Sequence, residues 1–114
     1  MLKTIPEVIT QARQSLNIIT AADAAKKCKN DNGIIIDVRE PAEFAEKAAS
    51  NTINIPRGLL EMKMLQMHPD ENLAIFIHCA SGARAIFAAE QLNRVGYKNV
   101  WAVTCKLDDV CCAF

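Results

Sequence analysis

The stretch Leu73–Ala89, LAIFIHCASGARAIFAA, decides the fold because its residue pattern changes sharply in the middle. The run Leu73–Ile77 has the aliphatic and aromatic composition of a strand that is covered on both faces. Cys79 stands just beyond this run, and small residues lead into a helical segment, Arg84–Val95, which Gly96 ends at the usual C-cap position. The pattern predicts a buried strand, a tight loop and a helix.

Cys79 stands at the predicted N-terminus of this helix, where negative charge is favoured. Free main-chain N–H groups and the positive end of the helix dipole both stabilise an anion there. The small residues from Ala80 to Ala83 allow several amides to converge on one point, and Arg84 adds a permanent positive charge. A lone cysteine is often a small core residue instead. This loop favours a nucleophilic thiolate at Cys79. The same amides would then hold the anionic group that the sulfur carries after it has reacted.

Four segments resemble, in the same order, segments of the single-domain rhodanese sulfurtransferases. The loop Cys79–Arg84, CASGAR, is similar to the active-site loop of that family. The stretch Ile34–Phe44, IIIDVREPAEF, is similar to the signature near the start of the family's domain. Thr52–Pro56 resembles the middle strand, and Gly96–Val100 resembles the lead into the last strand. Together these matches cover about residues 18–103.

The alternation of strand-like and helix-like segments predicts an α/β fold, and the resemblance implies the rhodanese architecture. The sheet is expected to be mainly parallel and five-stranded, with helices on both faces. Residues 17–114 are expected to form the rhodanese-like domain, and residues 1–16 an N-terminal helical extension that starts at a capping box. The strands are expected near Ile18, Ile34, Ile53, Leu73 and Val100.

The spacing between Cys79 and Arg84 separates two covalent chemistries. Phosphatases of this general type place five residues between the cysteine and the arginine, whereas this chain has four. The shorter loop forms a smaller cup, which suits one sulfur atom on Cys79 better than a whole phosphate. His78 directly before the cysteine is similar to the phosphatase signature, so a phosphatase or arsenate reductase stays as an alternative.

The predicted reaction is the transfer of a sulfane sulfur through a persulfide on Cys79. The thiolate attacks a small sulfur-containing anion such as thiosulfate, and a thiol or protein acceptor then takes the sulfur. No cofactor is expected. The residues expected to bind the donor are Ala80, Ser81, Gly82, Ala83, Arg84 and Arg57.

Three residues outside the loop are predicted to lie near it. Asp37 and Arg39 end the second strand, and ligands gather at the carboxyl ends of parallel strands. We expect these two residues to form an ion pair that braces the loop around Cys79. Cys105 follows the last strand, so it is either a second thiol that receives sulfur from Cys79 or an inert small residue.

Two segments differ from the family pattern and keep a different function open. Ala45–Asn51 lacks the Gly-His-Ile-Pro-Gly-Ala run of many relatives, and the tail Thr104–Phe114 is also atypical. A non-catalytic or persulfide-carrier binding module is therefore the alternative to an enzyme.

Between these segments, the helix Leu59–Met67 is expected to pack its methionines into the core.

Composition limits the partners and the compartment. The 114 residues include 13 acidic and 13 basic side chains, and a net charge of zero argues against nucleic-acid binding through bulk charge. No apolar run approaches the roughly 18 residues that span a bilayer, and no signal peptide is recognisable, so a cytoplasmic protein without membrane contact is expected. The five cysteines, among them Cys111 and Cys112, are an odd number, which predicts reduced thiols. The spacing of the cysteines predicts no metal site. The sequence carries no signal for an oligomeric state.

Overall fold

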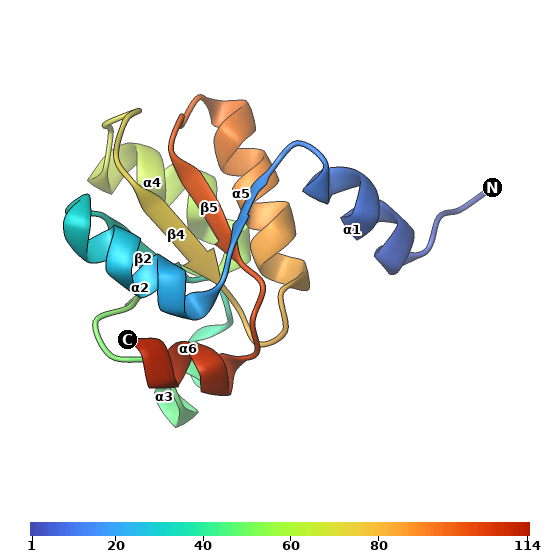
Figure 1. The fold of residues 1–114 in the computed structure, drawn as a ribbon. Coiled ribbons are helices and arrows are strands. Elements are labelled where there is room, and N and C mark those ends of the chain that lie inside the picture. The colour runs from blue at the N-terminus through green and yellow to red at the C-terminus, as the bar shows by residue number, and fades with distance from the viewer.

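A parallel sheet of five strands forms the centre of the computed structural model, which describes residues 1–114 (Figure 1). The strands lie in the order β1-β5-β4-β2-β3, so β4 is central and β1 and β3 are the edges. Every strand pair is parallel, as the sequence predicts. The strands are β1 (Asn17–Ile19), β2 (Ile34–Asp37), β3 (Ile53–Asn54), β4 (Ile75–His78) and β5 (Val100–Val103).

Helices cover both faces of this sheet (Figure 1). On one face, α5 packs against both α1 and α4, and on the other face α2 packs against α6. The short α3 lies beside α6 near the carboxyl ends of the strands. The helices are α1 (Ile5–Arg13), α2 (Ala21–Asn30), α3 (Pro41–Glu46), α4 (Leu60–Met67), α5 (Ala83–Val95) and α6 (Leu107–Ala113), and a 3-10 turn, η1 (Arg57–Leu59), precedes α4.

The sheet separates two apolar clusters because side chains alternate along each strand. Ile75 and Ile77 of β4 belong to the cluster beneath α4 and α5. Phe76, between them, belongs to the cluster beneath α2 and α6. All three side chains are fully buried. Both faces of β4 are therefore covered, which explains why this strand is an uninterrupted apolar run in the sequence.

Capping residues set the helix ends that the sequence indicates. The Thr4 hydroxyl accepts a hydrogen bond from the Glu7 main-chain N–H at 3.3 Å, so α1 starts where the capping box predicts. Thr20 caps α2 in the same way through Asp23. At the other end of α5, Gly96 has a φ of 126°, a conformation that glycine adopts without the steric cost of a side chain.

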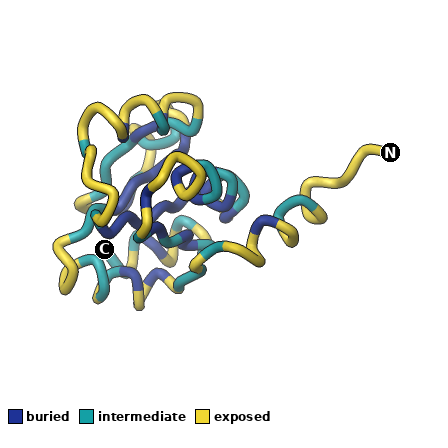
Figure 2. The backbone as a smooth tube through the Cα atoms, turned by 90° about the horizontal axis from the view of Figure 1, so that it is seen from above, coloured by how far each residue is buried: buried dark blue, intermediate teal, exposed yellow.

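The N-terminal helix is packed onto the domain through its inner face. Ala12 of α1 is buried in the cluster beneath α5, and Ile9 packs against the same cluster. The residues before α1 lie outside this contact, and Figure 2 shows the N-terminal segment extending away from the body of the protein. Met1 and Leu2 are exposed.

Two features of the structure differ from expectation. No element was predicted after β5, yet α6 forms there and buries Val110 against the sheet. In α4, Met64 is fully buried, but the prediction of core packing is wrong for Met62 and Met67, which are 63% and 52% exposed. The reason is that this helix turns only one stripe, four residues apart at Leu60 and Met64, toward the sheet.

Gly33 is expected to tolerate no side chain, because a Cβ there would lie 2.6 Å from the Ala74 carbonyl oxygen. That oxygen accepts the main-chain hydrogen bond of Ile34, so relieving the clash separates β2 from β4. We predict that Gly33→Ala lowers the free energy of unfolding by about 1–3 kcal/mol in urea denaturation. Gly58→Ala is the matched control, because its Cβ would meet nothing within 4 Å. An equal loss in both variants would contradict the prediction.

Candidate active site

The Cys79 sulfur lies against main-chain amides at the start of α5. Its Sγ accepts hydrogen bonds from the N–H groups of Gly82 at 3.1 Å and Ala85 at 3.4 Å. The Ala85 amide is one of the N–H groups that a helix leaves without an internal partner, so the thiol takes the place of an N-cap side chain. Cys79 is only 1% exposed. The buried sulfur therefore faces two main-chain donors, of which Gly82 belongs to the predicted loop and Ala85 lies beyond it, in α5.

Gly82 gives this loop its shape. Its φ of 108° lies in the left-handed region, where a residue with a side chain is strained. A Cβ at this position would also lie 3.1 Å from the carbonyl oxygen of Thr104, in the segment that leads to α6. A further contact ties the loop to the same segment, since the Leu107 N–H donates to the Ala80 carbonyl at 3.1 Å. The tail after β5 thus packs directly on the loop, whereas the Ser81 residue is exposed.

Arg84 is held by a carboxylate from a distant part of the chain. Its Nη1 and Nη2 atoms donate to the two oxygens of Glu43 at 2.6 and 3.0 Å. Glu43 lies in α3, where it also accepts the main-chain N–H of Glu40 and so completes the cap of that helix. The hydrogen bonds from Arg84 and from Glu40 lower the pKa of Glu43 to about 2. The pair is therefore ionised throughout the neutral pH range.

Asp37 and Arg39 form a buried ion pair behind the loop. The Arg39 Nε and Nη2 atoms donate to the Asp37 carboxylate at 2.7–3.0 Å, and the residues are 3% and 0% exposed. Arg39 also donates to the Lys47 carbonyl at 2.7 Å, which ties the end of α3 to the sheet. Asn54 of β3 donates to the carbonyls of both Asp37 and Arg39. Asn54 was not singled out from the sequence, where nothing local marks it.

His78 lies beside this ion pair and directly precedes the cysteine. It is fully buried, its Nδ1 is 3.4 Å from the Cys79 carbonyl oxygen, and its Nε2 is 3.7 Å from Asp37 Oδ2. The position follows from the register, because Asp37 of β2 is paired with His78 of β4. Burial lowers the pKa of His78, although the Asp37 charge acts in the opposite direction. The imidazole beside the charged pair is therefore buried and neutral at neutral pH.

The other predicted site residues lie in different surroundings. The Arg57 guanidinium binds Glu61 of α4 at 2.7 Å, and both side chains are partly exposed. Cys105 accepts the Ala21 N–H at 3.3 Å and packs against the cluster beneath α2 and α6, whereas Cys79 belongs to the opposite cluster. The role of each in binding or relay stays a prediction.

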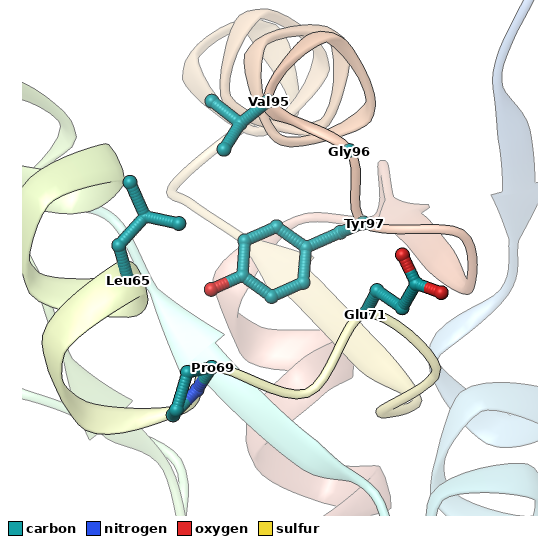
Figure 3. Close-up of a pocket in the computed structure, with 6 residues that line it drawn as sticks. All are labelled: Leu65, Pro69, Glu71, Val95, Gly96 and Tyr97. Carbon is teal, nitrogen blue, oxygen red and sulfur yellow. The ribbon is translucent and has the colours of Figure 1, made fainter.

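Two hollows of the surface differ in character. One, lined by Arg39, Glu43, Glu46, Lys47 and Leu107, lies beside the active-site loop, because Leu107 bonds the loop and Glu43 bonds Arg84. The other is more apolar and is shown in Figure 3, where Tyr97 lies among Leu65, Pro69 and Val95. It is formed at the C-terminal end of α5, the end opposite to Cys79. The first hollow is therefore the one that bears on the chemistry of the loop.

Comparison with known proteins gives the family. The rhodanese-like domain matches residues 20–108, a range that includes the loop from Cys79 to Arg84. The chain belongs to the rhodanese-like domain family. None of its helices combines the length and the apolar character needed to cross a bilayer.

Several relatives are named as sulfurtransferases. A putative mitochondrial thiosulfate sulfurtransferase of Schizosaccharomyces pombe is 32% identical over 80 residues, which cover 59% of this chain and 55% of that protein. The thiosulfate sulfurtransferase PspE of Escherichia coli is 31% identical over 65 residues, covering 57% of this chain and 62% of that protein. The chain thus spans little more than half the length of these curated relatives. The solved polysulfide-sulfur transferase homodimer from Wolinella succinogenes is 26% identical with a TM-score of 0.72, covering 90% of this chain and 78% of that chain.

The buried His78 is expected to make stability depend on pH. Because its folded-state pKa lies below the ordinary value of 6.5, the unfolded chain binds more protons, and the stabilisation is complete only above about pH 6.5. It is lost as the pH falls through the folded-state pKa. We predict that His78→Gln shows a smaller decrease in unfolding free energy than the parent between about pH 7 and pH 5. The measurement is the unfolding free energy from chemical denaturation at each pH. An equal decrease in the variant and in the parent would contradict the prediction.

Proposed function

We propose that the protein is a sulfurtransferase that carries a sulfane sulfur as a persulfide on Cys79. The observation that carries the proposal is the pair of main-chain N–H groups, from Gly82 and Ala85, that point at the Cys79 sulfur. Membership of the rhodanese-like family and the thiosulfate sulfurtransferases among its relatives support the same chemistry.

The reaction has two steps. The Cys79 thiolate attacks the outer sulfur of a donor such as thiosulfate, a sulfur–sulfur bond forms, and the bond to the sulfonate sulfur breaks to release sulfite. The persulfide anion stays in the loop, held by the amides and by the positive end of α5. An acceptor nucleophile then takes the outer sulfur and leaves the Cys79 thiolate. A thiol or a protein is the acceptor in the cell, and cyanide serves in an assay.

The donor would bind through main-chain N–H groups and side-chain cations around the loop. The amides from Ala80 to Ala83 and the guanidinium of Arg84 are the nearest candidates for its anionic end. Arg57 is a second cation, at the start of η1. Both guanidinium groups have carboxylate partners, Glu43 and Glu61, so a donor anion must compete with these carboxylates.

Thiosulfate treatment followed by mass spectrometry of the intact protein tests the proposal. We expect a gain of about 32 Da, the mass of one sulfur atom, which is lost on adding cyanide and is absent in Cys79→Ser. The absence of this gain with thiosulfate and with other sulfane donors would overturn the proposal and favour a non-catalytic binding module. Hydrolysis of an aryl phosphate that depends on Cys79 would instead favour a phosphatase.

Cys105 supplies the matched control for this experiment. Its thiol bonds α2 and packs in the cluster on the far side of the sheet, so we expect Cys105→Ser to keep the mass gain and the turnover of the parent. A persulfide that forms on Cys79 but reaches an acceptor only when Cys105 is present would contradict this and make Cys105 a relay thiol.

A further inference from the structure

Each arginine of the predicted site is paired with a carboxylate. Arg84 is paired with Glu43 at 2.6 Å, Arg39 with Asp37 at 2.7 Å, and Arg57 with Glu61 at 2.7 Å. These three arginine–carboxylate pairs therefore add no net positive charge to the positive end of α5. A site designed to attract a dianion would be expected to keep at least one of these cations free.

The Arg84–Glu43 pair differs from the others by its position. Arg84 is the second residue of α5, directly next to Ala85, whose amide bonds the Cys79 sulfur. The pKa of Arg84 is raised by the hydrogen bond to Glu43 first, and the negative form of Cys79 contributes as well. Arg84 therefore directly precedes the residue whose amide bonds the reacting sulfur, and Glu43 holds its guanidinium with both oxygens.

We propose that Glu43 is a specificity-determining residue that masks the charge of Arg84, so that the site favours sulfur donors of low negative charge over dianions such as thiosulfate. This rests on the proposed function and names its donor class. A dianion must displace the Glu43 carboxylate to reach the guanidinium, whereas a persulfide of an organic thiol or a protein carries one negative charge at its reacting end. Glu43 acts through Arg84 and is a positioning residue.

Two donors that break the same kind of sulfur–sulfur bond but differ in charge separate the effect of charge from that of bond chemistry. Thiosulfate carries two negative charges and releases sulfite, and methanethiosulfonate carries one and releases methanesulfinate. In both cases the Cys79 thiolate forms a bond to the terminal sulfur, the bond between that sulfur and the oxidised sulfur breaks, and cyanide then removes the outer sulfur as thiocyanate. The ratio of kcat/KM for thiosulfate to kcat/KM for methanethiosulfonate reports the preference of the site for the second charge.

The test compares this ratio in the parent, in three variants and in one control variant. We expect Glu43→Gln to raise it by about five- to tenfold, because the Arg84 charge is released while the glutamine oxygen can still cap α3. Arg84→Gln should lower the ratio, since it leaves the Glu43 charge unpaired. The double variant, Glu43→Gln with Arg84→Gln, removes a neutral pair and should return the ratio close to that of the parent.

Glu46→Gln is the matched control. Glu46 lies in the same helix and lines the same hollow, but it forms no ion pair with Arg84. An equal rise of the ratio in Glu46→Gln would show a general field effect and overturn the proposal. An unchanged ratio in Glu43→Gln would also overturn it. A ratio in the double variant as low as that in Arg84→Gln would do the same, because Arg84 would then bind the donor without being masked by Glu43. Thermal unfolding of each variant shows that it is folded, and a ratio within one protein is independent of the active fraction.

Failure of this proposal and failure of the proposed function give different results. If the parent gains no sulfur on Cys79 from either donor, the sulfurtransferase function is wrong. If both donors load Cys79 and Glu43→Gln leaves the ratio unchanged, the function stands and only the role of Glu43 is wrong.

Discussion

The Cys79 sulfur occupies the position of a capping group at the start of α5, and the arrangement of the site depends on this. A helix start leaves main-chain N–H groups without partners, and a loop of small residues brings two of them to one sulfur atom. Gly82 has to adopt a left-handed conformation for the loop to curl in this way. A polar sulfur inside an otherwise apolar cluster is thereby satisfied by the backbone itself, without a histidine or a carboxylate in contact with it.

The buried charges behind the loop fix the frame in which this contact is made. The Asp37 carboxylate accepts from Arg39, and the Arg39 guanidinium also donates to the Lys47 carbonyl, so neither charge is left unpaired in the interior. Asn54 adds bonds from β3 to both residues. Because β2 and β4 are paired through Asp37 and His78, the frame and the cysteine belong to adjacent strands of one sheet. The carboxyl edge of the sheet is therefore held by several bonds before any donor arrives.

The sequence was sufficient for the parts of the structure that depend on local pattern. The strand–loop–helix unit around Cys79 carries apolar, small and capping residues in the order that such a unit needs, and the neighbouring helices have Thr4 and Thr20 as caps. It was insufficient for contacts between distant segments. Glu43 stands between two other glutamates, Glu40 and Glu46, and only the packing of α3 on the loop selects it as the partner of Arg84. The short α6 was missed because its polar and cysteine-rich segment becomes helical through its contact with α2.

The hydrogen bond from Leu107 to Ala80 has a thermodynamic consequence for the loop. The loop is fixed at one end by β4, at the other by α5, and between them by the tail that leads into α6. A segment restrained at three places has already lost its conformational entropy when the chain folds, so little ordering is left for the moment at which a donor binds. The loop is thus preorganised by the C-terminal residues of the chain, and a change in that tail can alter catalysis without touching the cysteine.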